Sequence, residues 1–282
     1  VTFFCAVAVI NGQITFGMMI STQFIIGMMN GPIMQFVSFI QSAQYAKISF
    51  MRINEIHKLE DEDDTSPIIS NSLALPKDKS LIVKNLSFRY SPHAPIVLKN
   101  INLTIPEGKV TAIVGDSGCG KSTLLKLLLR MYVPSYGEIS IGQMNINNIG
   151  LREWRSKCGC VMQDGKLFND TIQNNIVLNE ENIDYDALKR ATEVACINKE
   201  IEAMPQGYQT TIGEMGRGLS GGQRQRLLIA RALYKKPDYL FLDEATNALD
   251  TINEQKIVKA LNNVFVNRTV IIIAHRLSTI RK

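Results

Sequence analysis

The sequence predicts an α/β domain built around a parallel sheet and preceded by a transmembrane helical segment. Residues 1–46 contain no Asp, Glu, Lys, Arg or His, whereas charged residues occur at ordinary density in the rest of the chain. Residues 239–242 and 269–274 are short apolar runs of the kind that is buried on both faces of a parallel sheet. A glycine-rich segment, residues 115–123, lies between a predicted strand and a predicted helix.

The composition indicates a folded protein, since 45% of its 282 residues are hydrophobic. The formal net charge is only +5 and the basic residues form no long blocks, so we expect no nucleic-acid partner. The five cysteines show no disulfide-like spacing. Cys158 and Cys160 lack a second pair that would complete a zinc site, so we expect free thiols in a reducing compartment.

The uncharged segment predicts membrane helices. Residues 3–10 are apolar, residues 11–13 are typical of a turn, and residues 14–40 are long enough to cross a bilayer. Polar and small residues within this run suit a helix that faces other helices or a water-filled path, although a kinked packing helix is the alternative. We expect the helix to continue to about residue 56. No signal-peptide pattern is present, and we interpret the chain as part of a longer protein.

The domain that follows an acid-rich linker begins with predicted strands. These cover residues 81–83, 86–90, 101–105 and 110–114. Residues 106–109 form the predicted turn between the last two. We therefore expect a small antiparallel layer at the start of this domain.

The glycine-rich segment predicts a phosphate-binding loop. Its glycines let backbone N–H groups surround an anion at the start of a helix, where the helix dipole favours negative charge. Lys121 can reach the outer phosphates, and the Ser122 hydroxyl is placed to hold Mg²⁺. The nucleotide-binding residues are Gly115, Asp116, Ser117, Gly118, Cys119, Gly120, Lys121, Ser122 and Thr123. This loop alone does not separate a kinase, a GTPase, a helicase and a transporter.

Two carboxylates follow the apolar run at residues 239–242. Ligands of doubly wound sheets bind at the carboxyl ends of the strands, so Asp243 is expected to hold the metal. Glu244 is expected to orient and deprotonate an attacking water, which requires hydrogen-bond reach more than unusual basicity.

A second predicted anion site lies between these motifs. Its residues are Leu219, Ser220, Gly221, Gly222 and Gln223, and a predicted helix, residues 224–235, follows. Ser-Gly-Gly at a helix start aims N–H groups and a hydroxyl at one point. Because the first loop already surrounds the phosphates of one nucleotide, we infer that this site closes on a nucleotide held by a partner copy. The alternative is that Ser220 only caps the helix.

In this order the motifs resemble the nucleotide-binding domain of ABC transporters, whose signature sequence is LSGGQ, over about residues 80–282. The resemblance implies the P-loop NTPase fold, with a RecA-like core, an antiparallel β layer and a helical subdomain at about residues 165–218. It also implies an ATP hydrolase whose domain continues beyond residue 282. Residues 1–56 then resemble the end of an exporter transmembrane domain, with residues 57–79 as the linker.

The resemblance also implies roles for single residues. Tyr90 corresponds to the aromatic residue that stacks on adenine, and Gln163 to the glutamine that links metal and water to the membrane domain. His275 corresponds to the histidine that contacts the terminal phosphate. Asp250 lies in a loop facing the partner subunit, and Glu214 in an exporter-type segment that touches coupling helices.

The mechanism expected from this resemblance is a dimer, of two copies or of homologous subunits, that sandwiches two ATP molecules with Mg²⁺. Closure drives an attached membrane domain, and hydrolysis resets it. Residues 162–165 and 247–250 resemble bacterial peptide or bacteriocin exporters, some of which carry an upstream peptidase. We therefore expect a multi-pass protein of the bacterial inner membrane with its ATPase domain in the cytoplasm. A lipid or multidrug exporter is the close alternative, and a soluble ABC ATPase the distant one.

Overall fold

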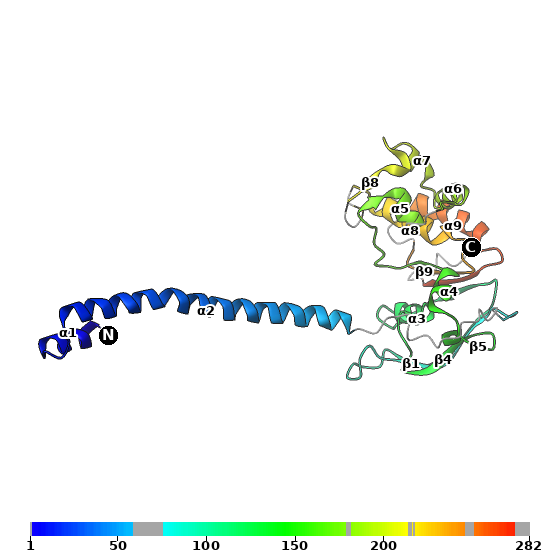
Figure 1. The fold of residues 1–282 in the computed structure, drawn as a ribbon. Coiled ribbons are helices and arrows are strands. Elements are labelled where there is room, and N and C mark those ends of the chain that lie inside the picture. Colours follow the sequence, from blue (N-terminus) through cyan, green and yellow to red (C-terminus); the bar gives the residue numbers. More distant parts are fainter. Residues whose placement is uncertain are drawn as a thin grey trace. The chain divides into compact units, whose positions relative to one another are not determined.

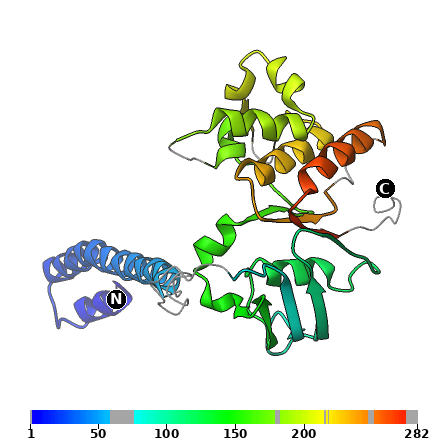
Figure 2. The same cartoon turned by 90° about the vertical axis from the view of Figure 1, so that its right-hand side faces the viewer.

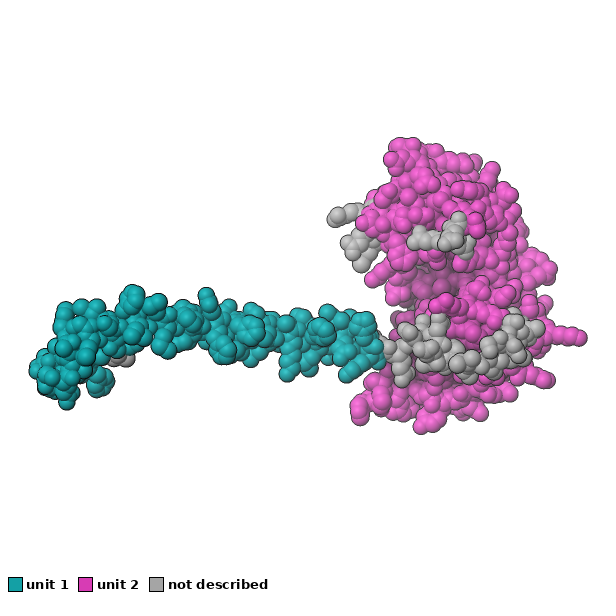
Figure 3. All heavy atoms as spheres, in the orientation of Figure 1, with its two compact units in different colours: residues 1–65 teal, residues 66–282 magenta. Residues whose placement is uncertain are grey.

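The computed structural model describes residues 2–58, 76–178, 182–213, 216, 218–245 and 251–273, with residues 251–253 described by their backbone alone. The chain forms two compact units, residues 1–65 and residues 66–282. Figure 3 shows the two units in different colours. Most of the predicted linker, residues 57–79, lies outside the described residues.

The described residues of the first unit form two helices, α1 (Thr2–Ile10) and α2 (Phe16–His57). Gly12 adopts a φ of +70° in the turn between them, and the Thr15 hydroxyl caps α2 by accepting from the Met18 N–H. Pro32 lies inside α2 without ending it. Within the described part of the chain, α2 is the helix that is long and apolar enough to cross a membrane by length and composition. Its bounds agree with the predicted helix.

The second unit contains a parallel sheet in the order β3, β10, β9, β6. Its strands are β3 (Val110–Ile113), β10 (Thr269–Ile273), β9 (Tyr239–Asp243) and β6 (Cys158–Val161). Neighbouring strands pair in parallel throughout. The apolar runs of β9 and β10 are therefore buried strands, as predicted.

A second sheet is antiparallel, in the order β2, β1, β4, β5. Its strands are β1 (Leu81–Phe88), β2 (Leu98–Ile105), β4 (Tyr136–Ile141) and β5 (Met144–Asn145). The two strands predicted within residues 81–90 form the single strand β1, whose register shifts after Val83 near Asn85, a residue with a positive φ.

The prediction that residues 110–114 belong to the antiparallel layer is wrong. After the turn at Gly108, where φ is +66°, β3 pairs with β10 instead of β2. The physical reason is that β3 is completed by β10, a strand about 160 residues later in the chain, and local sequence carries no record of that partner.

The parallel sheet separates two hydrophobic clusters because successive side chains of a strand point to opposite faces. Tyr239 and Phe241 of β9 lie in one cluster, whereas Leu240 and Leu242 lie in the other. Figures 1 and 2 show α5, α6, α8 and α9 on one side of this sheet, and α3 with the antiparallel sheet on the other. The predicted α/β architecture is confirmed.

The helices of the second unit are α3 (Lys121–Leu128), α4 (Leu151–Ser156), α5 (Ile172–Val177), α6 (Tyr185–Val194), α7 (Asn198–Glu202), α8 (Gly221–Tyr234) and α9 (Thr251–Phe265), with the 3₁₀ turns η1 (Ile146–Asn148) and η2 (Gly207–Gln209). β7 (Asp170–Thr171) and β8 (Thr211–Ile212) form a short antiparallel pair. Helices α5, α6 and α7 therefore occupy the region predicted to be a helical subdomain.

Candidate nucleotide-binding site

The glycine-rich loop connects β3 to α3. Gly118 and Gly120 have φ values of +81° and +95°, in the left-handed region that side chains disfavour. A Cβ at Gly120 would lie 2.8 Å from Leu98 Cδ2, and one at Gly115 would lie 2.9 Å from Cys119 Sγ. The positive φ values favour glycine at positions 118 and 120 of the tight path, which leads the backbone into the N-terminus of α3.

Lys121 folds back over this loop from the first position of α3. Its Nζ donates to the backbone oxygens of Gly115 and Asp116, at 2.8 and 2.7 Å, and the residue is only 8% exposed. Cys119 Sγ lies 3.8 Å from the same Nζ. The ammonium group is thus held on the concave side of the loop, where it would meet an anion.

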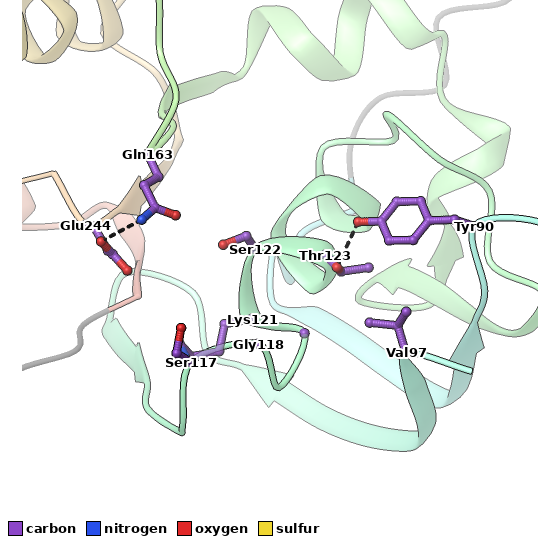
Figure 4. A pocket seen from close by; sticks show the side chains of 10 residues that line it. Tyr90, Val97, Ser117, Gly118, Lys121, Ser122, Thr123, Gln163 and Glu244 are labelled. Atoms are coloured by element: carbon purple, nitrogen blue, oxygen red, sulfur yellow. Dashed lines mark hydrogen bonds between the residues drawn. The ribbon is translucent and has the colours of Figure 1, made fainter. Parts of the chain in front are cut away.

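A cavity of about 320 Å³ opens beside the loop. It is lined by Tyr90, Val97, Ser117, Gly118, Gly120, Lys121, Ser122, Thr123, Gln163 and Glu244. Figure 4 shows side chains from the loop, from the segments after β1, β6 and β9, and from Val97 before β2 around one space. Segments far apart in the sequence therefore meet in a single cavity.

Tyr90 lines this cavity on the side opposite Glu244 (Figure 4). Its hydroxyl hydrogen-bonds Thr123 Oγ1 at 2.9 Å, and its ring meets those of Phe88 and Tyr132 edge to face, with centroids 5.0 and 5.2 Å apart. The residue is 48% exposed. It therefore has fixed neighbours and a surface that remains available to a flat ligand group.

Asp243, the last residue of β9, is 1% exposed and shares a hydrogen bond with Ser122. Its Oδ1 is buried and has no hydrogen-bond partner within the part of the chain that the structure describes. Burial raises the pKa of its carboxyl, and the charges of Glu244 and Asp164 raise it further, against the lowering effect of Ser122 and Lys121. A buried carboxylate oxygen beside a hydroxyl is a donor set of the type that Mg²⁺ prefers.

Gln163 and Glu244 meet because β6 and β9 are neighbours whose carboxyl ends lie at the same edge of the sheet. Gln163 Nε2 donates to Glu244 Oε2 at 3.0 Å. The amide oxygen of Gln163 points away from Glu244, to the side on which Ser122 lies (Figure 4). Glu244 has a φ of +52°, which is strained for a residue with a side chain, and its N–H donates to Ile273 O at 3.2 Å.

The second predicted anion site does not line this cavity. Ser220 caps α8 and forms a capping box with Gln223, whose side-chain oxygen accepts from the Ser220 N–H at 2.8 Å. Gly221 and Gly222 are the first helical residues, whose N–H groups cannot reach carbonyls within the helix. Capping is therefore present, and it leaves these two N–H groups available to an external anion.

Three predicted site residues, Glu214, Asp250 and His275, lie outside the described residues. Val97 lines the cavity without having been predicted, since a valine before a strand carries no chemical signal. Glu200 and Arg226 were also missed. Glu200 reaches Arg226, and also Gln223 of the signature segment (residues 219–223), through the packing of α7 against α8, which no local pattern reveals.

Comparisons with known proteins show to which family the chain belongs. Residues 98–247, more than half of the chain, match the model of the ABC transporter family. The chain is 40% identical over 275 residues to the exotoxin translocation ATP-binding protein PaxB of Pasteurella aerogenes. It is 38% identical over 274 residues to the alpha-hemolysin translocation ATP-binding protein HlyB of Proteus vulgaris. Each match covers 97% of this chain and 38% of the relative.

A solved structure is also similar. The structure of a bacterial Atm1-family ABC exporter with ATP bound matches with a TM-score of 0.75 and 37% sequence identity, over 84% of this chain and 41% of that one. The chain thus spans well under half the length of these relatives. The family match covers the segment that runs from β2 past the phosphate-binding loop, the signature segment and β9. The chain belongs to the ABC transporter family, and its second unit is an ATP-binding domain of that family.

Proposed function

We propose that the protein is the ATP-binding and ATP-hydrolysing part of an ABC exporter. The observation that carries this proposal is the contact between Gln163 and Glu244 in the same cavity as Lys121. It supplies a carboxylate and an amide oxygen opposite a phosphate-binding loop. In this proposal residues 1–56 are the end of the transmembrane domain, residues 57–79 a linker and residues 80–282 the nucleotide-binding domain.

Within this cavity, Tyr90 stacks on adenine and the loop with Lys121 binds the phosphates. Ser122, Asp243 and Gln163 would hold Mg²⁺, which would supply positive charge at the transferring phosphoryl group. The unpartnered Oδ1 of Asp243 supports this assignment.

Glu244 is the proposed base for water attack. Its hydrogen bond with Gln163 keeps the carboxylate at the cavity edge and makes water positioning sensitive to the segment after β6. His275 is proposed to contact the terminal phosphate. Because the barrier of phosphoryl transfer is lowered mainly by positioning and charge stabilisation, Lys121 and the loop N–H groups contribute without any covalent step.

The signature segment is proposed to bind the phosphates of an ATP held by a second subunit, identical or homologous. One domain needs a single phosphate cradle per nucleotide, and here Leu219–Gln223 lie away from the cavity. Asp250 is proposed to face the partner and Glu214 to contact the membrane domain. ATP binding would thus drive dimer closure.

The proposed substrate is a peptide or protein, a bacteriocin being the narrower form of this proposal. Its support is the names of similar proteins, which describe translocation of an exotoxin, export of a leukotoxin and translocation of an alpha-hemolysin. The part of α2 up to residue 46 carries no charged residue, which supports a place in the membrane, with the second unit in the cytoplasm of a bacterium.

Replacement of Glu244 tests the proposed activity. Glu244→Gln keeps the side-chain shape and removes the base, so we expect ATP turnover to fall at least about 100-fold. ATP binding should persist, and the protein should accumulate as an ATP-bound dimer. The measurements are steady-state phosphate release and analytical ultracentrifugation with ATP.

Glu193→Gln is the matched control, since Glu193 is an exposed residue of α6. This variant should hydrolyse ATP at the rate of the unaltered protein. Full turnover in Glu244→Gln would reject the assignment of the base, and a protein that binds ATP and stays monomeric would reject the dimer.

A further inference from the structure

Glu200 of α7 joins the signature segment to the body of the helical part of the second unit. Its Oε1 accepts from Arg226 Nη1 at 2.6 Å. Its Oε2 accepts from Arg226 Nη2 and from Gln223 Nε2, both at 2.9 Å. One carboxylate on a five-residue helix thus holds two side chains from the first turns of α8.

Arg226 makes this contact from a buried position. Its side chain is 6% exposed, and its guanidinium also donates to the backbone oxygens of Cys196 and Gly222, at 2.9 and 3.3 Å. A buried guanidinium needs a paired, hydrogen-bonded anion, and the bidentate contact with Glu200 provides one. The pair therefore fixes the start of α8 against the chain around Cys196.

Gln223 shows what this anchoring achieves at the signature. An amide has a donor end and an acceptor end, and Glu200 can accept only from the donor end. With Nε2 bound to Glu200, Oε1 faces the Ser220 N–H and completes the capping box. The acceptor at Glu200 thus selects the amide orientation that holds the backbone of Ser220 in place.

Glu200 is ionised in this arrangement. Although burial raises its pKa, hydrogen bonds from Arg226 and Gln223 lower it more, so that it lies below its ordinary value. The carboxylate is therefore available as an acceptor for both partners at neutral pH.

We propose that Glu200 is a positioning residue for the signature segment, which keeps the N-terminus of α8 preformed for the phosphates of ATP held by the partner subunit. The inference rests on the proposed function, because it assigns the signature to that nucleotide. Glu200 touches no substrate. It acts through Gln223 and Arg226.

The test compares Glu200→Gln with Glu202→Gln, an equal charge change at an exposed position of the same helix. Each is made in the full chain carrying Glu244→Gln and studied in detergent micelles. ATP-dependent dimerisation is measured by analytical ultracentrifugation. ATP affinity is measured separately at protein concentrations too low for dimers.

We expect Glu200→Gln to weaken ATP-dependent dimerisation about tenfold, because one charged, partly buried hydrogen-bond acceptor is lost. Its ATP affinity as a monomer should stay within about twofold of the parent, and Glu202→Gln should match the parent in both measurements. The loss should shrink in a protein that already carries Gln223→Ala, because the two side chains act through one contact.

Equal dimerisation by Glu200→Gln and Glu202→Gln would overturn the inference. So would a parallel loss of dimerisation and monomer ATP affinity, which marks general damage to the fold. Should Glu200→Gln fail to fold, Glu200→Asp keeps the charge on a shorter side chain and must dimerise more weakly with ATP than Glu202→Gln while its monomer ATP affinity is unchanged. If the protein that carries Glu244→Gln alone never dimerises with ATP, the proposed function is rejected instead.

Discussion

Glu244 shows how the fold directs a single carboxylate. Its φ of +52° turns the chain just after β9, while its N–H is held by Ile273 O of β10. Strain of this kind persists only where surrounding structure imposes it. The result is that Asp243 stays buried in the strand end and Glu244 reaches Gln163 at the cavity edge. Two neighbouring acids thus face different tasks.

Tyr90 provides a residue-scale prediction. If its exposed ring stacks on adenine, Tyr90→Ala should lower ATP affinity about tenfold, since stacking of a base on an aromatic ring is worth about 1–3 kcal/mol. Tyr90→Phe should lose less, because it keeps the ring and gives up only the hydrogen bond to Thr123. Binding of a fluorescent ATP analogue measures both.

Tyr136→Ala is the control, since Tyr136 is an exposed tyrosine at the start of β4 and does not line the cavity. It should bind ATP like the parent. Unchanged affinity in Tyr90→Ala would remove Tyr90 from the nucleotide site.

At the scale of elements, the packing of α8 against β6 explains the Cys158-Gly-Cys160 sequence. These residues belong to a strand of the parallel sheet, and all five cysteines are free thiols. Burial raises the pKa of both Cys158 and Cys160, which keeps them protonated. Gly159 is needed because a Cβ there would collide with the backbone oxygen of Ala232 in α8. The glycine thus lets α8, the helix that begins in the signature segment, lie close to the sheet.

Gly159→Ala should therefore destabilise the second unit. Overpacking a buried contact costs about 1–3 kcal/mol, and here the neighbour is backbone that cannot rotate away. Urea unfolding followed by tryptophan fluorescence reports the change, because Trp154 is buried against Tyr239 of β9.

Gly150→Ala serves for comparison, since a Cβ at Gly150 would have its nearest neighbour at 3.9 Å. We expect it to cost less than about 1 kcal/mol, mainly through the start of α4. Equal stability of Gly159→Ala and the parent would show that α8 can shift away from β6 at little cost.

For the whole molecule, the two units place an apolar helix and an ATP-binding domain in one chain. Polar side chains such as Gln23 and Asn30 lie within α2, where a helix surrounded by lipid alone would disfavour them. Their presence suits a helix that faces other helices or the path of a polar substrate. The proposed export of a peptide or protein would require both units of the molecule.

Cross-linking tests the substrate class. A photoreactive residue at Gln23, in the protein expressed in bacterial cells, is expected to capture polypeptides, and mass spectrometry identifies the adducts. The same probe at Asn147, exposed in η1, should capture no such set. Adducts at Gln23 that contain only lipids or small hydrophobic molecules would favour a lipid or multidrug exporter. Recovery of the protein outside the membrane fraction would favour a soluble ATPase.

The sequence by itself determined the features that depend on local spacing. The glycine-rich loop, the acids after β9, the start of α8 and the length of α2 are each written within a few consecutive residues, because turns, caps and membrane spans are set by near neighbours. The nucleotide-binding family was therefore recognisable from these motifs.

Only the tertiary structure decided which distant elements meet. It moved β3 into the parallel sheet, placed Gln163 within 3.0 Å of Glu244, and brought Glu200 of α7 to Gln223 and Arg226 of α8. Strand order and helix packing depend on burial across the whole domain, which has no signature in any short stretch of residues. The proposed role of Glu200 follows only from its contact with the guanidinium of Arg226, which the fold buries beside it.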